Sequence, residues 1–487
     1  MSKEFYRIRS LESLIGKHKE LDNQEIFFQT PEKLNDPMEG FIEFVFNGDK
    51  IVWKNFFKHY IICFEWIFQN YIIYGENGIQ LGVEYIPIFK TFEELESPEY
   101  KQLISKITES FFENSGELVN EISQITTDIS KDELLRYLYF SHNVLLEIVQ
   151  RTYEDQELMP RRKQITKIDI NNIKNISKYI NAIEKLREEY GHEKVNILHQ
   201  DSVAWYEKMM LELNCNTVMG KETPNKNFIL NFNSHYLEAL KKLTYPKVYV
   251  ASFLENPYNS STWGNYGENH TGVCLIFKSD KEQLEFSNVL SGDRPITQSL
   301  KFKKVNYDSD FKEINFFESF GLLTYQKIYS WYIDESNNES ILFDKMFKNE
   351  DSWREEFWGK FEKNKLIKTK DWHYEKEYRL TYHRLSDYEV PKEHRKLKYD
   401  FNSLKGLIFG IKTPLDKKCE IIEIIKNKCK ERNRNDFEFN QAYYCNSEKE
   451  IRYRNLNLKF NDTIQKSKKV TKSIKKVKTI NDKNKYN

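Results

Sequence analysis

A long stretch with helical periodicity, from residue 50 to residue 245, separates two segments of strand character, and this arrangement limits the folds open to the chain. Ser130 and Glu133 have the spacing of a capping box, and apolar residues that share one helical face follow them. These residues are Leu134, Leu135, Leu138, Leu145, Ile148 and Val149. A second series with the same spacing runs over 173–186 and reaches a predicted stop at Gly191. The stretch is therefore predicted to be a mainly helical insertion that buries its own apolar surface.

Strand character on both sides of the insertion indicates a sheet core. Apolar and basic residues alternate over 5–9, which places Arg7 and Arg9 on one face of a strand. Further strands are expected at 25–29, 247–253, 272–277, 372–382, 404–410 and 437–445. The predicted fold is therefore α+β, with a mixed or antiparallel sheet core that the helical insertion splits. The expected divisions are a core formed by 1–48 plus 246–450, an insertion over 49–245 and a basic tail over 460–487.

Composition favours a folded protein in a reducing compartment. Aromatic residues make up 15% of the chain, which is enough apolar surface for a sizeable core. The six cysteines form no CxxC pair, so neither a zinc site nor a disulfide framework is expected. The start of the chain lacks a signal-peptide pattern, and Glu65 interrupts the most apolar segment, 60–68. We expect a soluble, cytoplasmic protein with no membrane contact.

Charge is distributed unevenly along the chain. The formal net charge is +1, yet residues 466–487 contain nine Lys and one Asp. Any attraction to nucleic acid would therefore come from this tail or from a local patch. A tail that is merely solvated is the alternative.

The segment 371–383 holds the residues with the clearest chemistry. Interpreted as one strand, it places Glu375, Glu377 and Arg379 on one face with His373, and aromatic side chains on the other face. Two carboxylates flanked by Arg and His can position a sugar hydroxyl or stabilise a developing positive charge. The alternative is a solvated strand face whose charges pair with one another. If the two carboxylates serve a ligand, Glu377→Gln is expected to lower activity but to change stability little, because a carboxylate that faces a cleft contributes little to folding.

Small polar residues, glycines and aromatic residues are concentrated in 256–272, directly before an apolar strand. Hydroxyl groups and rings of this kind suit a nucleotide-sized ligand. The candidate ligand-binding residues are Ser261, Thr262, Trp263, Tyr266 and His270. The alternative is a long turn in which a capped short helix packs Trp263 on the core.

Several short motifs occur in order along the chain. They are Phe-Gln-Thr-Pro at 28–31, Leu-Asn-Asp-Pro-Met-Glu at 34–39, Trp-Gly-Asn-Tyr at 263–266, His-Thr-Gly-Val at 270–273, Trp-His-Tyr-Glu-Lys-Glu-Tyr-Arg at 372–379 and Ile-Phe-Gly at 408–410. This set resembles the bacterial family known as Domain of Unknown Function 2971 over 5–46 and 247–445. Met38 departs from the usual aromatic residue, and Ser261-Thr262 replaces a Leu-Met pair. If the motifs form one site, Asn35 and Asp36 join the candidate ligand-binding residues.

An aromatic-Arg strand, a Ser/Thr-containing strand edge and a late Glu-x-Glu strand also resemble the motif order of arginine-type ADP-ribosyltransferases. This resemblance implies that Arg7 holds the phosphates or ribose of NAD and that Ser261 or Thr262 braces the nicotinamide ribose. It further implies that Glu377 stabilises the cationic ribose as nicotinamide leaves, while Glu375 orients the acceptor. NAD would thus be the substrate, in ADP-ribosyl transfer or in NAD cleavage.

Two classes of function remain open at this stage. The first is a nucleotide-acting enzyme, which family associations would place in bacterial phage defence or toxin action. The second is a non-catalytic module whose insertion contacts a protein partner and whose tail contacts nucleic acid. The histidines of the insertion lack metal-ligand spacing, so no metal is expected. No Rossmann or P-loop motif occurs, so neither of these nucleotide-binding folds is indicated.

Overall fold

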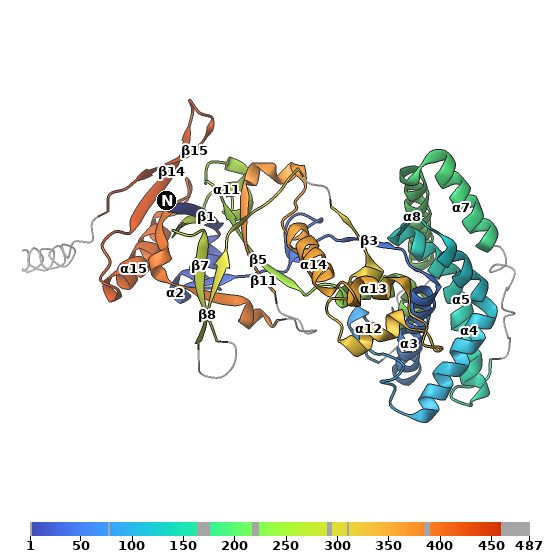
Figure 1. Cartoon of the computed structure of the whole chain (residues 1–487). Coiled ribbons are helices and arrows are strands. Elements are labelled where there is room, and N and C mark those ends of the chain that lie inside the picture. The colour runs from blue at the N-terminus through green and yellow to red at the C-terminus, as the bar shows by residue number, and fades with distance from the viewer. Residues whose placement is uncertain are drawn as a thin grey trace, which may run out of the picture.

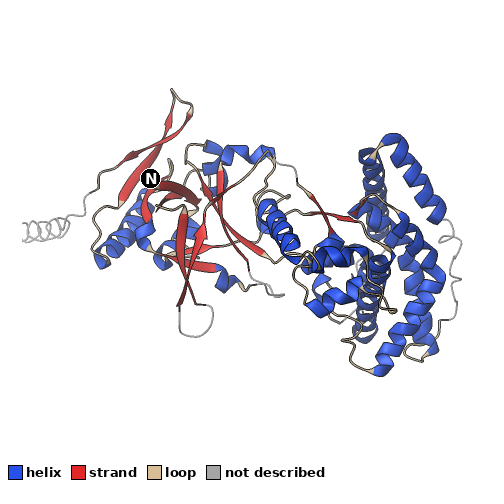
Figure 2. Cartoon of the chain, viewed as in Figure 1, coloured by secondary structure: helices blue, strands red, loops and turns tan. Residues whose placement is uncertain are grey.

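The computed structural model describes residues 2–75, 78–162, 176–216, 224–289, 295–308, 311–383 and 390–458. Strands gather at one end of the molecule, with the N-terminus, and long helices gather at the other end (Figure 1, Figure 2). The predicted α+β class is confirmed. Within the described ranges, no helix is both long and apolar enough to cross a membrane. The expected basic tail, 460–487, lies outside the described residues.

A mixed sheet forms the centre of the strand-rich end. Its described strands lie in the order β15-β14-β13-β6-β1-β5-β11-β9. They are β1 (Lys3–Arg9), β5 (Val248–Leu254), β6 (Val273–Ser279), β9 (Lys303–Lys304), β11 (Glu377–His383), β13 (Leu404–Phe409), β14 (Glu438–Cys445) and β15 (Glu450–Asn455). β13 and β14 run parallel, whereas the other neighbours are antiparallel. The expected mixed sheet is therefore present, and β1 lies near its middle.

A second sheet and helix α15 (Leu415–Glu431) pack on one face of the central sheet. This second sheet has the order β2-β12-β7-β8, with strands β2 (Glu25–Phe27), β12 (Lys396–Tyr399), β7 (Gln283–Val289) and β8 (Pro295–Lys301). The short helices α1 (Leu11–Leu14) and α2 (Glu20–Asn23) connect β1 to β2. Phe253, Leu380, Phe286 and Ile421 belong to the same buried apolar cluster. Because strand side chains alternate, residues such as Ser252 point away from this cluster. The two sheets and α15 are called the sheet unit below.

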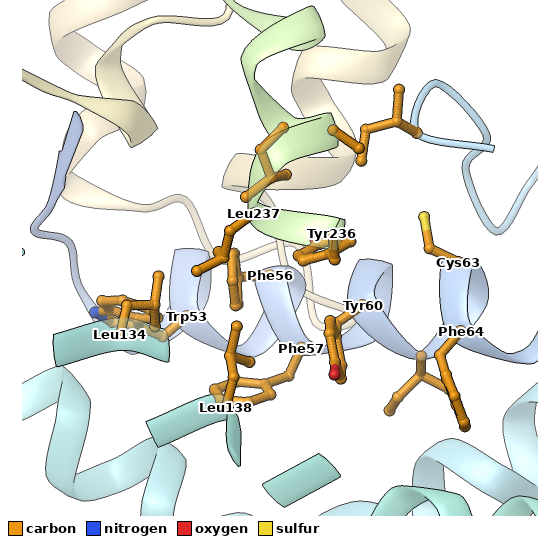
Figure 3. Packing of buried hydrophobic residues seen from close by; sticks show 14 of the residues in the cluster. Trp53, Phe56, Phe57, Tyr60, Cys63, Phe64, Leu134, Leu138, Tyr236 and Leu237 are labelled. Carbon is orange, nitrogen blue, oxygen red and sulfur yellow. The ribbon is translucent and has the colours of Figure 1, made fainter. Parts of the chain in front are cut away.

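The helix-rich end contains the expected insertion. Its described helices are α3 (Lys50–Tyr74), α4 (Pro98–Gln124), α5 (Lys131–Asp155), α7 (Ile176–Tyr190), α8 (His192–Asn216), α9 (Pro224–Leu230) and α10 (Phe232–Leu240). Ser130 caps α5 by accepting a hydrogen bond from the backbone N–H of Glu133, as its spacing predicts. Figure 3 shows α3 directing large aromatic side chains, such as Phe56 and Phe57, toward α5 and α10. The rings of Phe56 and Tyr236 lie 5.6 Å apart in this core.

A second segment of the chain, well after the insertion, joins the same helical core. It forms β10 (Glu313–Asn315), α12 (Tyr325–Tyr332), α13 (Ile341–Phe347) and α14 (Glu350–Asn364). Phe317 packs 4.9 Å from Trp53 of α3, and Trp331 belongs to the same buried cluster. β10 also pairs with β3 (Glu43–Phe46), which pairs with β4 (Ile129–Ser130). The expectation that 246–450 belongs entirely to the core is thus wrong for 313–364. Helices α3–α10 and α12–α14 are called the helical unit below.

Candidate active site

A pocket of about 260 Å³ opens in the sheet unit where β1 and β5 separate. The two strands pair at Tyr6 and Leu254, and β5 then pairs with Gln29 at Val250. Arg7 fills the gap, because its Nη1 donates to the carbonyl oxygen of Ser252, 2.8 Å away. The segment that follows Gln29 and the start of β11 both contribute to the pocket lining.

The pocket brings together five of the candidate residues from distant parts of the sequence. These are Arg7, Asn35, Tyr266, Glu375 and Glu377. Ser252, Glu39 and Lys368, which the sequence analysis did not select, line the same pocket. Arg7 of β1 therefore lies in the same pocket as Glu375 and Glu377, as the prediction of one shared site requires.

Three residues of the 256–272 segment lie elsewhere. Trp263 is 1% exposed, and its Nε1 donates to the carbonyl oxygen of Pro257 at 2.8 Å. Thr262 is buried and donates from Oγ1 to the carbonyl oxygen of Asn259, while Ser261 is exposed. All three belong to α11 (Ser260–Tyr266), a short helix that Asn259 caps. None of the three lines the pocket, and the alternative of a capped helix that packs its Trp on the core is confirmed.

His270 and Arg379 also do not line the pocket. His270 has a left-handed backbone with φ of 72°, and its N–H donates to the carbonyl oxygen of Trp263. It therefore shapes the turn between α11 and β6. In the same turn, a Cβ on Gly272 would lie 2.3 Å from the carbonyl oxygen of Arg9, so glycine is required by this close approach. Arg379 is buried behind Glu377 and acts through that carboxylate.

Asp36 is a positioning residue that joins two distant segments. Its Oδ1 accepts from the N–H of Met38, and its Oδ2 accepts from the hydroxyl of Thr369 at 2.9 Å. The tight turn thereby places Glu39 next to Lys368, which precedes Thr369 in the chain. Asp36 itself is buried and outside the pocket lining, so the structure gives it a positioning role in place of the expected ligand contact.

The segment 371–383 does not form one strand. Its first part is a 3₁₀ helix at Lys370–Glu375, and Lys376 has a left-handed backbone with φ of 46°. β11 then starts at Glu377. The turn at Lys376 directs the side chains of Glu375 and Glu377 toward a common cation. The expected single strand face is therefore wrong, although the two carboxylates still meet.

Lys368 is that common cation. Its Nζ lies 2.8 Å from Glu375 Oε2, 3.1 Å from Glu377 Oε2 and 3.2 Å from Glu39 Oε1. Arg379 adds hydrogen bonds to Glu377 and, at 2.6 Å, to Glu39. All five side chains are less than a tenth exposed. We call these five residues the charge cluster. Its burial shows that the solvated strand face considered above is wrong, and its ion pairs make Glu377 a structural member of the cluster as well as part of the pocket lining.

Glu377 remains ionised within the charge cluster. Burial raises the pKa of its carboxyl group, but the positive charges of Arg379 and Lys368 outweigh burial and hold the pKa well below its ordinary value. Tyr266 approaches from α11 and donates to Glu375 Oε1 at 2.6 Å. Burial and the nearby carboxylate raise the pKa of Tyr266, so its phenol stays protonated.

Arg7 differs from Lys368 and Arg379 because its hydrogen bonds go to backbone carbonyl groups and to no carboxylate. It is 8% exposed, and its Nη1 and Nη2 donate to the carbonyl oxygens of Ser252 and Phe27. Its buried Nε has no hydrogen-bond partner. Burial and the neighbouring charge of Arg9 lower the pKa of Arg7 to about 9, which leaves it charged at neutral pH. A buried cation without a paired carboxylate is suited to binding an anionic ligand group.

The chain is thus an α+β protein in which a buried charge cluster and a buried arginine line one pocket. A family model described as Protein of unknown function (DUF2971) matches residues 262–380. The matched segment begins in α11 and contains Lys368, Glu375 and Glu377, whereas Arg7 and Glu39 lie outside it. No curated protein and no solved structure matches the chain. Among the described residues, no group of three or more His, Cys, Asp or Glu side chains could hold a metal ion.

Proposed function

We propose that the chain is an enzyme that binds a nucleotide in this pocket and breaks its N-glycosidic bond. NAD is the first expected substrate, and the products would be nicotinamide and either an ADP-ribosylated acceptor or free ADP-ribose. The observation that carries the proposal is the shared pocket of Arg7, a buried cation without a paired carboxylate, and Glu377, a buried carboxylate held ionised.

In this proposal, Arg7 binds a phosphate group at the gap between β1 and β5. Glu377 supplies negative charge near the ribose, where positive charge develops as the glycosidic bond breaks. Tyr266 and Glu375 bind ribose hydroxyl groups, and Ser252 takes the place first assigned to Ser261 or Thr262. A volume of about 260 Å³ is below the roughly 300–1,000 Å³ of most small-molecule sites, so one mononucleotide half of NAD would enter the pocket.

A binding module without catalysis is the second candidate. Both carboxylate oxygens of Glu377 already accept hydrogen bonds from Arg379 or Lys368. This pairing offsets the charge that a cationic transition state would need, and it favours a rigid wall for the pocket. The same Arg7 would then hold an anionic ligand without chemistry.

The wider roles expected from the sequence also stand as proposals. Apolar side chains on the helical unit support a protein partner there, since Leu198, Trp205 and Leu211 of α8 are at least half exposed. Nucleic-acid contact by the Lys-rich tail and action in bacterial phage defence or as a toxin rest on the sequence arguments above.

Incubation of purified protein with NAD tests the proposed reaction. The wild-type protein is expected to release nicotinamide or to transfer labelled ADP-ribose to a macromolecule. Arg7→Met removes the buried cation, and we expect apparent affinity for NAD to fall by about 30-fold or more, equivalent to about 2 kcal/mol. Chromatographic detection of nicotinamide over a range of NAD concentrations measures both effects.

Arg434→Met is a matched control for this substitution. Arg434 also donates to backbone carbonyl groups, those of Phe401 and Leu404, but it lies outside the pocket lining. It should leave the affinity for NAD unchanged. Binding of NAD without product formation would favour the binding module, and equal affinity in the wild-type and Arg7→Met proteins would remove Arg7 from the site.

A further inference from the structure

The charge cluster contains one more acidic than basic group. Glu39, Glu375 and Glu377 share only two cations, Lys368 and Arg379, and all five are buried. An uncompensated charge at such a site is strongly disfavoured, and a bound proton removes it. The cluster is therefore neutral when one of its three carboxyl groups is protonated.

Hydrogen bonding identifies the group that holds this proton. Glu377 accepts from Arg379 and Lys368 through both oxygens, and Glu375 accepts from Tyr266 and Lys368 through both of its own. Glu39 is 4% exposed and accepts one hydrogen bond, from Arg379 to Oε1, while Lys368 Nζ forms an ion pair with the same oxygen at 3.2 Å. Its Oε2 is buried, has no hydrogen-bond partner and belongs to a residue that lines the pocket.

Electrostatics agree with this placement of the proton. Burial raises the pKa of Glu39, and the adjacent charge of Glu377 raises it further against the opposing effects of Arg379 and Lys368. The pKa of Glu39 is thus raised while that of Glu377 is lowered. Active sites commonly contain such a pair, in which one carboxyl group acts as the acid and the other stabilises positive charge.

We propose that Glu39 carries the proton of the charge cluster on Oε2 and donates it to the leaving group of the ligand in the pocket. This inference rests on the proposed cleavage of a glycosidic bond. Two other groups near Glu39 that could give up a proton are already engaged, since the Lys368 ammonium contacts three carboxylates and the Tyr266 hydroxyl binds Glu375. Glu39, the last residue of the 34–39 motif, thus becomes a catalytic residue that the sequence did not single out.

A proton donor widens the class of substrate to nucleotides with an uncharged base. As the C1′–N bond breaks, its electron pair moves to the base nitrogen, which takes the proton from Glu39. The oxygen of a water molecule forms the new bond to C1′, and a proton of that water returns to the Glu39 carboxylate. A nucleoside 5′-monophosphate and water therefore give ribose 5-phosphate and free base. Nicotinamide needs no such proton, because the ring nitrogen of NAD is already positive.

Thermal melting and infrared spectroscopy test the protonation without any substrate. Glu39→Gln keeps the shape and the neutrality of a protonated carboxyl group, so its melting temperature should equal that of the wild-type protein. The wild-type spectrum at neutral pH should contain one C=O component of a protonated carboxyl group that is missing from the Glu39→Gln spectrum, whereas any component from Glu65, whose pKa burial also raises, should be the same in both. Glu377→Gln is the matched control and should melt at a clearly lower temperature, because it neutralises a carboxylate that two cations require. Identical C=O bands in the wild-type and Glu39→Gln spectra, or an equal fall in melting temperature for both variants, would overturn the assignment.

Paired assays with AMP and NAD test the donation. We expect Glu39→Gln to slow adenine release from AMP by about 100-fold or more, within the range of general acid catalysis, and to slow nicotinamide release from NAD far less, because that leaving group needs no proton. Adenine release by the wild-type protein should also fall as pH rises through the raised pKa of Glu39, because the donor is then lost.

The outcomes of these assays separate the inference from the proposed function. Equal slowing with both substrates would mean that Glu39 positions the cluster rather than donating a proton. Nicotinamide release without adenine release by the wild-type protein would overturn the wider substrate class. If the wild-type protein releases neither product, the proposed function fails and proton donation fails with it, while the infrared band still decides where the proton lies.

Discussion

Lys368→Met is expected to destabilise the folded protein by about 3–5 kcal/mol, because it removes one member of a buried ionic network. Lys368 contacts Glu39, Glu375 and Glu377, and its own side chain is buried. Methionine fills similar volume but leaves three carboxyl groups with Arg379 as their only cation within the cluster. Urea unfolding followed by circular dichroism measures the change in the free energy of unfolding.

An exposed lysine provides the control for this prediction. Lys417 pairs with Glu420 on α15, and both side chains are about two-fifths exposed. Lys417→Met should change the free energy of unfolding by about 0–1 kcal/mol, as is usual for a surface ion pair. Similar small changes for both substitutions would show that the carboxyl groups of the charge cluster do not depend on Lys368.

Trp263→Ala is the second substitution with a large expected effect, about 3–5 kcal/mol of lost stability. The indole is buried in an apolar cluster with Tyr6 and Ile8 of β1, and its N–H binds the Pro257 carbonyl oxygen. Alanine leaves a cavity and an unpaired carbonyl group. The same unfolding measurement checks this prediction.

Trp205 of α8 is the matched control for Trp263, because its side chain is 62% exposed. Trp205→Ala should change stability by less than about 0.5 kcal/mol. A direct ligand contact by Trp263 would instead appear as weakened NAD binding by a Trp263→Ala protein of unchanged stability, and that result would return Trp263 to the site.

Local sequence patterns predicted much of the fold. Alternation over 5–9 predicted β1, and the spacing of Ser130 and Glu133 predicted the start of α5. Both signals depend on residues close together in the sequence. The assignment of 313–364 to the helical unit depends instead on contacts such as Phe317 with Trp53, which no periodicity within that segment indicates.

The candidate site was predicted in part for the same reason. The motifs identified Arg7, Glu375 and Glu377, which meet in one pocket, but Lys368 lies in no recognisable motif. Glu39 was within the 34–39 motif, yet nothing in the neighbouring sequence indicated its role. Its contact with Arg379 joins residues 340 positions apart. The spacing of charges over 371–383 also suggested a solvated face. The burial of the charge cluster depends instead on the turn at Lys376 and on packing between the segment that contains Glu39 and the segment 368–379.

The two-part construction of the helical unit has a consequence for how such a protein can arise and be dissected. Asn55 of α3 donates to the carbonyl oxygens of Trp331 and Ile333, and Asp49 accepts from the N–H of Ile341. Deleting residues 49–245 alone would remove the packing partners of β10 and α12–α14 and leave their aromatic surface exposed. The helical unit therefore cannot be added or removed by a single insertion or deletion. A shorter ancestor would have to lack both 49–245 and 313–364, or to contain another packing partner for whichever segment it kept.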